Sequence, residues 1–184
     1  VEDVLIEFNK EIVEALNELA CKAKRITSKE NSIITVVQEN KDLGFVGTPT
    51  EINKEFLTET IKLNEVPVVA PLGLDKDNQT FNINADTAAG SIAIELKARR
   101  LMIISDVEGV LDSEKKLIPE INSKKANELI DQEVISGGMI PKIKNCLDVA
   151  SNGVKAVVII DGRKNHSLLF ELLSDKGSGT LIRE

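Results

Sequence analysis

Aromatic residues and histidine are scarce in this chain of 184 residues, and basic residues are outnumbered by acidic ones; each of these features argues against a class of site. It has five Phe and no Trp or Tyr, so the stacking platforms that hold single-stranded nucleic acid are not expected. Asp and Glu exceed Lys and Arg by 30 to 23, giving a formal charge of −7, which argues against a nucleic-acid partner. The single histidine, His166, excludes a histidine-rich metal centre and is interpreted as an ordinary core or surface side chain.

Cysteine pairs and long apolar runs are absent as well. Cys21 and Cys146 lack CxxC spacing, which is typical of a reduced, intracellular protein with inert buried thiols. No run approaches the ~18 apolar residues of a membrane span, so we expect no membrane partner and a cytoplasmic location. The chain opens on VEDVLIEFNK, without an initiator Met or a targeting signature. We therefore expect the sequence to begin inside a longer protein.

What is present is a regular alternation of apolar runs and helical periodicity. A chain that is 42% apolar and of this length predicts one domain with a solid core. Apolar runs predict strands at 32–37, 43–47, 66–73, 100–107 and 155–161, and helical spacing predicts helices at 9–20, 50–63, 84–98, 122–130, 136–153 and 166–173. Asn9 is a plausible cap of the first helix. Apolar strands without alternation, such as 66–73, are expected to be buried on both faces of a parallel sheet covered by helices.

Ligands in such folds bind beyond the carboxyl ends of the strands, so the segments that follow the strands are the candidates for a site. Four polar or glycine-bearing segments are placed in this way, which predicts that they converge on one edge of the sheet. They are NINAD (82–86), the stretch after Ser105 in SDVEGVLD (105–112), SGGM (136–139) and DGR (161–163).

The SGGM segment precedes a predicted helix and is followed one turn later by Lys142. Paired glycines at a helix start expose main-chain N–H groups to a polyphosphate, and a lysine nearby adds a full positive charge. A tight turn with a surface lysine explains the same residues equally well. The segment is not a P-loop, because GxxxxGK[ST] does not occur.

The other two segments also allow a structural and a functional interpretation. In SDVEGVLD, Asp106 and the glycine turn suit a nucleotide base or ribose, or else a solvated turn. In NINAD, Asp86 falls in the first helical turn, where the helix dipole favours a carboxylate by ~0.3–1 kcal/mol, so capping alone is a sufficient explanation for it. Capping does not explain a second asparagine, because Asn82 and Asn84 both precede the helix.

The combination of these motifs is specific. NINAD, SDVEGVLD and SGGMIPK, together with VPVVAPLG before them and GVKAVVIIDGR and HSLLFELLSDKGSGTLI after them, closely resemble the acetylglutamate kinases, members of the amino-acid kinase family. The resemblance covers essentially the whole chain. It implies a three-layer α/β/α sandwich around a mainly parallel sheet, with the amino-terminal part of the family's domain missing. It further implies that 1–184 is a single domain, in which 1–70 is the remainder of the acetylglutamate-binding half and 71–184 is the ATP-binding half.

The resemblance also implies roles for individual residues. Asn82 and Asn84 match the side that binds N-acetyl-L-glutamate, Asp86 matches a carboxylate that orients lysines around the phosphates, and Lys142 matches one of those lysines. The segments matching the ATP site supply Asp106, Val107, Glu108, Gly109, Val110, Leu111, Val134, Ile135, Ser136, Gly137 and Gly138. The implied reaction moves the γ-phosphoryl of ATP to the side-chain carboxylate of acetylglutamate. Mg²⁺ is held through the phosphates, without a metal site of the protein's own, and the protein is a homodimer or larger homo-oligomer.

The family pattern also has parts that this sequence lacks. A strand with a second lysine, glycine-rich phosphate loops and an acetylglutamate-gripping arginine are expected ahead of Val1, so we expect no kinase turnover from these residues alone. Lys176 stands where arginine-inhibited relatives tend to carry an acidic residue, which argues against arginine feedback. Two alternatives stay open: a non-catalytic nucleotide-binding or dimerisation remnant, and a kinase for carbamate, glutamate or aspartate. NINAD, as the acetylglutamate-side match, argues against the second.

Overall fold

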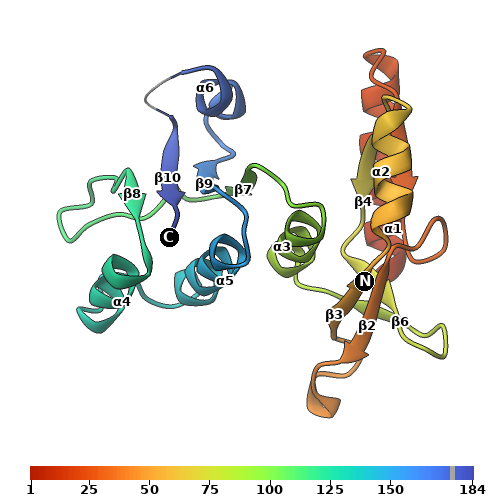
Figure 1. Cartoon of the computed structure of the whole chain (residues 1–184), viewed down its shortest axis with the longest axis horizontal. Coiled ribbons are helices and arrows are strands. Elements are labelled where there is room, and N and C mark those ends of the chain that lie inside the picture. The colour runs from red at the N-terminus through yellow and green to blue at the C-terminus, as the bar shows by residue number, and fades with distance from the viewer. Residues whose placement is uncertain (175–176) are drawn as a thin grey trace. The chain divides into compact units, whose positions relative to one another are not determined.

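The computed structural model of the chain describes residues 1–174 and 177–184 and divides into two compact units (Figure 1). Unit 1 is Val1–Leu96 and unit 2 is Lys97–Glu184. Each unit is described by itself below. The expected organisation as a single domain divided near residue 70 stays a prediction, and the interpretation that involves Lys176 lies outside the described residues.

Unit 1 combines three α-helices with two small sheets. Its elements are α1 (Glu2–Glu18), β1 (Ala23–Ile26), β2 (Ile34–Gln38), the short 3-10 helix η1 (Lys41–Leu43), β3 (Gly47–Ile52), α2 (Lys54–Lys62), β4 (Val66–Val69), β5 (Leu72–Leu74), β6 (Thr80–Asn82) and α3 (Ala85–Glu95). β1 and β4 form a parallel pair, against which α1 packs. The other sheet has the order β3-β2-β5-β6, with β2 parallel to β5 and the outer pairs antiparallel.

Unit 2 is built on one four-stranded sheet. Its elements are β7 (Leu101–Ser105), β8 (Glu120–Ile121), α4 (Ser123–Asp131), α5 (Met139–Ser151), β9 (Val157–Asp161), α6 (Ser167–Leu173) and β10 (Gly179–Ile182). The order is β7-β9-β10-β8, with β7 parallel to β9 and β10 antiparallel to it. β9 is buried at all five positions and contacts both α5 and α6, as expected for an apolar strand covered on both faces.

Asparagine side chains begin three of the helices. Asn53, Asn84 and Asn122 each accept a hydrogen bond from a main-chain N–H in the first turn of α2, α3 and α4, respectively. The predicted cap Asn9 is wrong, because helical periodicity continues upstream and α1 already begins at Glu2. Asn9 instead lies in the middle of α1, buried, and its Nδ2 donates to the Val68 carbonyl at 2.8 Å, which ties the helix to β4.

Other differences arise where the chain turns inside an apolar run. The expected strand at 66–73 is divided into β4 and β5, because the chain bends at Ala70 and Pro71, and β4 is only partly buried. The expected helix at 50–63 begins only at Lys54, since residues 50–52 belong to β3. Among the described residues, none of the helices has the length and apolar character needed to cross a bilayer.

Candidate active site

The NINAD segment turns from strand β6 into helix α3 within unit 1. Asn84 is the N-cap: its Oδ1 accepts from the main-chain N–H groups of Asp86 and Thr87 at 3.0 and 3.1 Å. Asp86, half-buried in the first turn, is therefore not the capping residue, and the cap does not account for its carboxylate. The structural interpretation of NINAD thus assigns the cap to Asn84, the dipole of α3 favours the Asp86 carboxylate in the first turn, and only Asn82 has no part in the helix start.

Asn82 lies beside a cavity of about 420 Å³ in unit 1. Its main-chain N–H donates to the Phe45 carbonyl at 2.9 Å, which fixes the end of β6 against the segment before β3. The cavity is lined by Val1, Glu2, Leu43, Phe45, Val46, Leu72, Gln79, Thr80 and Asn82. Most of this lining is apolar, with Asn82 and a few other polar groups at the wall, a composition that suits a small ligand with both apolar and polar parts.

The predicted nucleotide segment 106–111 directly follows β7 in unit 2. Gly109 has φ +138° and is buried, a conformation that L side chains rarely adopt. After it the chain forms a hairpin, in which the Ile118 N–H donates to the Val110 carbonyl at 2.8 Å. Val110 is 2% exposed and both of its main-chain groups are bonded within the protein, so it offers a ligand neither side chain nor main chain, whereas Asp106 and Glu108 are exposed.

Charged side chains gather where β7 and β9 end. The strands are parallel with Ser105 opposite Asp161, so their carboxyl ends meet at one sheet edge. Asp161 is 2% exposed and accepts from Arg163 through Nε at 2.9 Å and Nη2 at 3.0 Å. These bonds, with a further one from the Arg163 N–H, lower the pKa of Asp161 to about 2 and raise that of Arg163. Lys164 reaches Glu108 at 3.2 Å, so the turn after β9 holds the segment after β7.

The SGGM segment forms a tight turn that opens α5. Gly137 has φ +55°, in the left-handed region that favours glycine, but Gly138 has φ −65° and ψ −14°, which any residue adopts. A Cβ at Gly138 would meet nothing within 4 Å. Neither strain nor packing therefore accounts for glycine at 138, and the space in front of the helix start is open. Ile135 is 2% exposed and faces the core, whereas Ser136 is exposed.

Lys142 lies one turn into α5 and is half-buried. It belongs to unit 2, as do both nucleotide segments, whereas Asp86 and the two asparagines belong to unit 1. The structure thus brings the segments after β7 and β9 together at one edge and places Asn82 beside a cavity. Among residues 1–174 and 177–184, no group of three or more His, Cys, Asp or Glu side chains is arranged to hold a metal ion.

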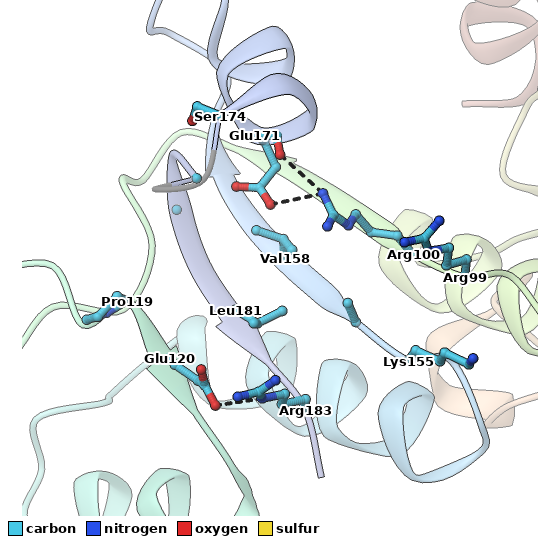
Figure 2. Close-up of a pocket in the computed structure, with 13 residues that line it drawn as sticks. Arg99, Arg100, Pro119, Glu120, Lys155, Val158, Glu171, Ser174, Leu181 and Arg183 are labelled. Atoms are coloured by element: carbon cyan, nitrogen blue, oxygen red, sulfur yellow. Dashed lines mark hydrogen bonds and ion pairs between the residues drawn. The ribbon is translucent and has the colours of Figure 1, made fainter.

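A larger cavity of about 550 Å³ lies in unit 2 over β9 and β10 (Figure 2). Two of its arginines are turned toward its own glutamates: Arg100 Nη1 donates to the carbonyl and carboxylate of Glu171 at 3.1 and 3.4 Å, and Arg183 Nε donates to Glu120 at 2.6 Å. Leu181 lines this cavity. Since alternate strand residues face opposite sides, Thr180 lies on the other face of β10, toward Val110.

Two residues with a part in this architecture were not singled out from the sequence. Thr180 is completely buried and bonds to Val110, a residue 70 positions away, which no local pattern reveals. Lys164 follows the DGR segment, whose position after an apolar strand was the available signal.

Comparison with known proteins places the chain in a family. The model of the amino acid kinase family matches residues 1–161. The chain is 95% identical over 184 residues to the acetylglutamate kinase of Pelagibacter ubique (strain HTCC1062), covering 100% of this chain and 64% of that protein. It is 45% identical over 175 residues to the acetylglutamate kinase of Ruegeria pomeroyi, covering 95% of this chain and 61% of that protein.

A solved structure has the same fold. The crystal structure of smu.665 from Streptococcus mutans UA159 matches with a TM-score of 0.79 and 30% identity, over 95% of this chain and 66% of that one. The chain thus spans less than two thirds of the length of the curated relatives it matches. The α/β class and the resemblance inferred from the motifs are confirmed: the chain belongs to the amino acid kinase family.

Proposed function

We propose that the protein is an acetylglutamate kinase, which transfers the γ-phosphoryl of ATP to the side-chain carboxylate of N-acetyl-L-glutamate in arginine biosynthesis. The observation that carries this proposal is the 95% identity, over the full chain, to a relative that bears this name. The reaction breaks the bond between the γ-phosphorus and the oxygen that bridges it to the β-phosphate. It forms a bond from a carboxylate oxygen to the γ-phosphorus, and ADP leaves.

Phosphoryl transfer depends on positioning and on neutralising charge more than on covalent chemistry. In this proposal Lys142 stabilises the charge that develops on the transferring phosphoryl, and Asp86 orients the cations around the phosphates. Asn82 binds acetylglutamate, in keeping with its place beside the mixed apolar and polar cavity of unit 1. Asn84 contributes at most its amide nitrogen to a substrate, since its oxygen is used by the helix cap.

Two segments of unit 2 would bind the nucleotide. The start of α5 offers open space at Gly138 and the positive end of the helix dipole, which favour a phosphate there, although the Met139 and Ile140 N–H groups already donate within the turn and Pro141 has none. Residues 106–111, held by the turn after β9, would take the base or ribose. Mg²⁺ would be held largely through the phosphates, because the described residues offer no cluster of protein ligands for it. Bound there, it would neutralise phosphate charge.

We also propose a cytoplasmic enzyme that works as a homodimer or larger homo-oligomer.

The nucleotide site is tested by titrating the 184-residue chain with MgATP in a calorimeter. Gly138→Ala is the informative variant, because its backbone is already helical and its Cβ meets no atom, so folding should be unchanged. The methyl group would occupy the space proposed for a phosphate, and overpacking of about 1–3 kcal/mol predicts an affinity loss of about fivefold to 150-fold. Unchanged affinity in a folded Gly138→Ala protein would contradict a phosphate site at this helix start.

The role of Lys142 is tested in any preparation that shows acetylglutamate-dependent ADP release. Lys142→Ala should lower kcat by about 10²-fold or more with little change in KM for ATP, because the charge is needed in the transition state. Lys144→Ala, an exposed lysine of the same helix, is the matched control and should behave as wild type. A rise in KM at constant kcat would show that Lys142 only binds the nucleotide.

A non-catalytic remnant is the competing function, and a second titration separates the two. Binding of both ATP and acetylglutamate supports the kinase, with the acetylglutamate affinity reduced in Asn82→Ala. Binding of ATP without acetylglutamate favours the remnant.

A further inference from the structure

A buried hydroxyl group helps to hold the segment that follows β7, together with the Lys164–Glu108 ion pair and the hydrogen bond from the Gly162 N–H to the Ser105 carbonyl. Thr180, in β10, is 0% exposed. Its Oγ1 accepts a hydrogen bond from the Val110 N–H at 2.8 Å and donates one to the Ile118 carbonyl at 2.7 Å. Val110 and Ile118 are themselves paired across the hairpin. One side chain therefore fastens both arms of the hairpin to the sheet.

The hairpin is rigid on its own side of this attachment. The Asp112 carboxylate accepts from the main-chain N–H groups of Glu114 and Lys116, both at 2.9 Å, which closes the turn. Thr180 fixes the base of this hairpin at Val110 and Ile118, and residues 106–109 lie between this attachment and the end of β7. Thr180 belongs to β10, which is hydrogen-bonded to β9 on one side and to β8 on the other, so the position of Thr180 in the sheet is fixed.

The approach between the hairpin and β10 is also unusually close at Gly109. A Cβ on Gly109 would lie 2.6 Å from the Thr180 Oγ1 and 3.1 Å from the Thr180 nitrogen. The main chain thus passes directly over Thr180. With the Val110 N–H already bonded to Thr180, the main-chain groups left for a ligand are those of the exposed part of the segment, around Asp106 and Glu108.

We propose that Thr180 is a positioning residue for the nucleotide: its hydroxyl sets the height and angle at which residues 106–109 stand above the carboxyl end of the sheet. The proposal rests on the proposed function, in which this segment binds ATP. Thr180 touches no ligand itself, because it is completely buried. It acts through Val110 and Gly109. The hydroxyl, and not the methyl group, is the part that matters.

The experiment compares Thr180→Ala with Thr180→Ser by calorimetric titration of the full 184-residue chain with MgATP. Both variants lose the same methyl group, but only alanine loses the hydroxyl and leaves the Val110 N–H and the Ile118 carbonyl without their buried partner. We expect Thr180→Ser to bind within about twofold of wild type and Thr180→Ala to bind about fivefold more weakly or worse. Hydrogen exchange at the Val110 amide should be faster in Thr180→Ala than in wild type and unchanged in Thr180→Ser.

A third variant separates positioning from general loss of stability. Ile182→Val lies two residues further along the same strand, is 0% exposed, and removes one methyl group without removing either hydrogen bond of Thr180. It should destabilise unit 2 without changing ATP affinity. If Thr180→Ala leaves unit 2 unfolded, Thr180→Val, which keeps the side-chain volume, replaces it in the comparison.

The outcomes are distinct. A wild-type chain that binds no MgATP overturns the proposed nucleotide site and this inference with it. If the wild-type chain binds MgATP, and Thr180→Ser has the same affinity for MgATP as Thr180→Ala or Thr180→Val, only the role of Thr180 is overturned. An equal loss of affinity in Ile182→Val would show that stability, not positioning, is responsible.

Discussion

Replacing Asn84 by alanine should weaken the start of α3 while leaving the rest of unit 1 in place. Asn84 accepts two main-chain hydrogen bonds, from Asp86 at 3.0 Å and Thr87 at 3.1 Å, and alanine can accept neither. Both N–H groups would then turn to water, because Asn84 is exposed. Loss of an asparagine cap costs about 0.5–2 kcal/mol and typically ~1 kcal/mol. The expected loss is therefore about 1 kcal/mol, a factor of about five in the opening equilibrium.

Urea unfolding followed by circular dichroism measures the total loss, and native-state hydrogen exchange locates it. Amides from Ala88 onward in α3 should exchange about fivefold faster if the helix opens from its first turn. Amides of α1 in the same unit serve as the internal reference. Asn84→Ser is the matched variant, because serine is an equally good cap, and it should remain within a few tenths of a kcal/mol of wild type.

The same variants separate the two interpretations of Asn84. If the residue only caps the helix, serine keeps both stability and acetylglutamate affinity. If its amide nitrogen also binds substrate, serine keeps stability but loses affinity. The reasoning fails if Asn84→Ala costs nothing measurable, or if serine is as damaging as alanine, because the two hydrogen bonds would then not be what begins the helix.

Two further predictions concern unit 2. The lowered pKa of Asp161 means that its ion pair with Arg163 stabilises the fold at pH values above the carboxyl's ordinary range and is lost as the pH falls through about 2. The stability difference between wild type and Asp161→Asn, from urea midpoints, should be constant between about pH 5 and 7 and shrink between about pH 4 and 2. If the stability difference between wild type and Asp161→Asn already shrinks between pH 5 and 7, a group other than the Asp161 carboxyl is responsible for its pH dependence. Gly179→Ala should destabilise unit 2 by about 3 kcal/mol or more, because its Cβ would overlap the Ile159 carbonyl oxygen. Circular dichroism and amide exchange measure this loss, and an unchanged midpoint would show that β9 and β10 part easily.

Local features of the fold were predictable from the sequence, because their causes are local. The asparagine that begins α4, Asn122, is expected from the residue itself, and its Oδ1 does accept from the Lys125 N–H at 2.9 Å. Likewise Gly153 ends α5 with φ +101°, as expected of a terminal glycine. Asn9 shows the limit of this reasoning. It has the right chemistry for a cap, but a partner on β4, 59 positions along the chain, decides its place.

The candidate site divides in the same way. The positions of Gly138 and Lys142 at the start of a helix follow from the SGGM pattern and the periodicity after it. The attachment of 106–111 does not, because it depends on how β10 inserts between β8 and β9. No strand was predicted at 179–182, where a short run that contains Gly179 gives little signal. The attachment of residues 106–111 to β10 is therefore visible in the structure but not in the sequence.

The strand order of unit 2 has a consequence for the time course of biosynthesis. β7 pairs only with β9 in the described sheet, and β9 follows it by roughly 55 residues. At a synthesis rate of about 5–20 residues per second, the apolar stretch Leu101–Ser105 leaves the ribosome several seconds before its partner exists. During that interval the nascent chain carries an unpaired strand edge, which is the kind of segment that chaperones bind and that aggregates when crowded. Pausing translation just before Val157 should therefore lengthen chaperone association, and synonymous codon choice in that region becomes a determinant of yield.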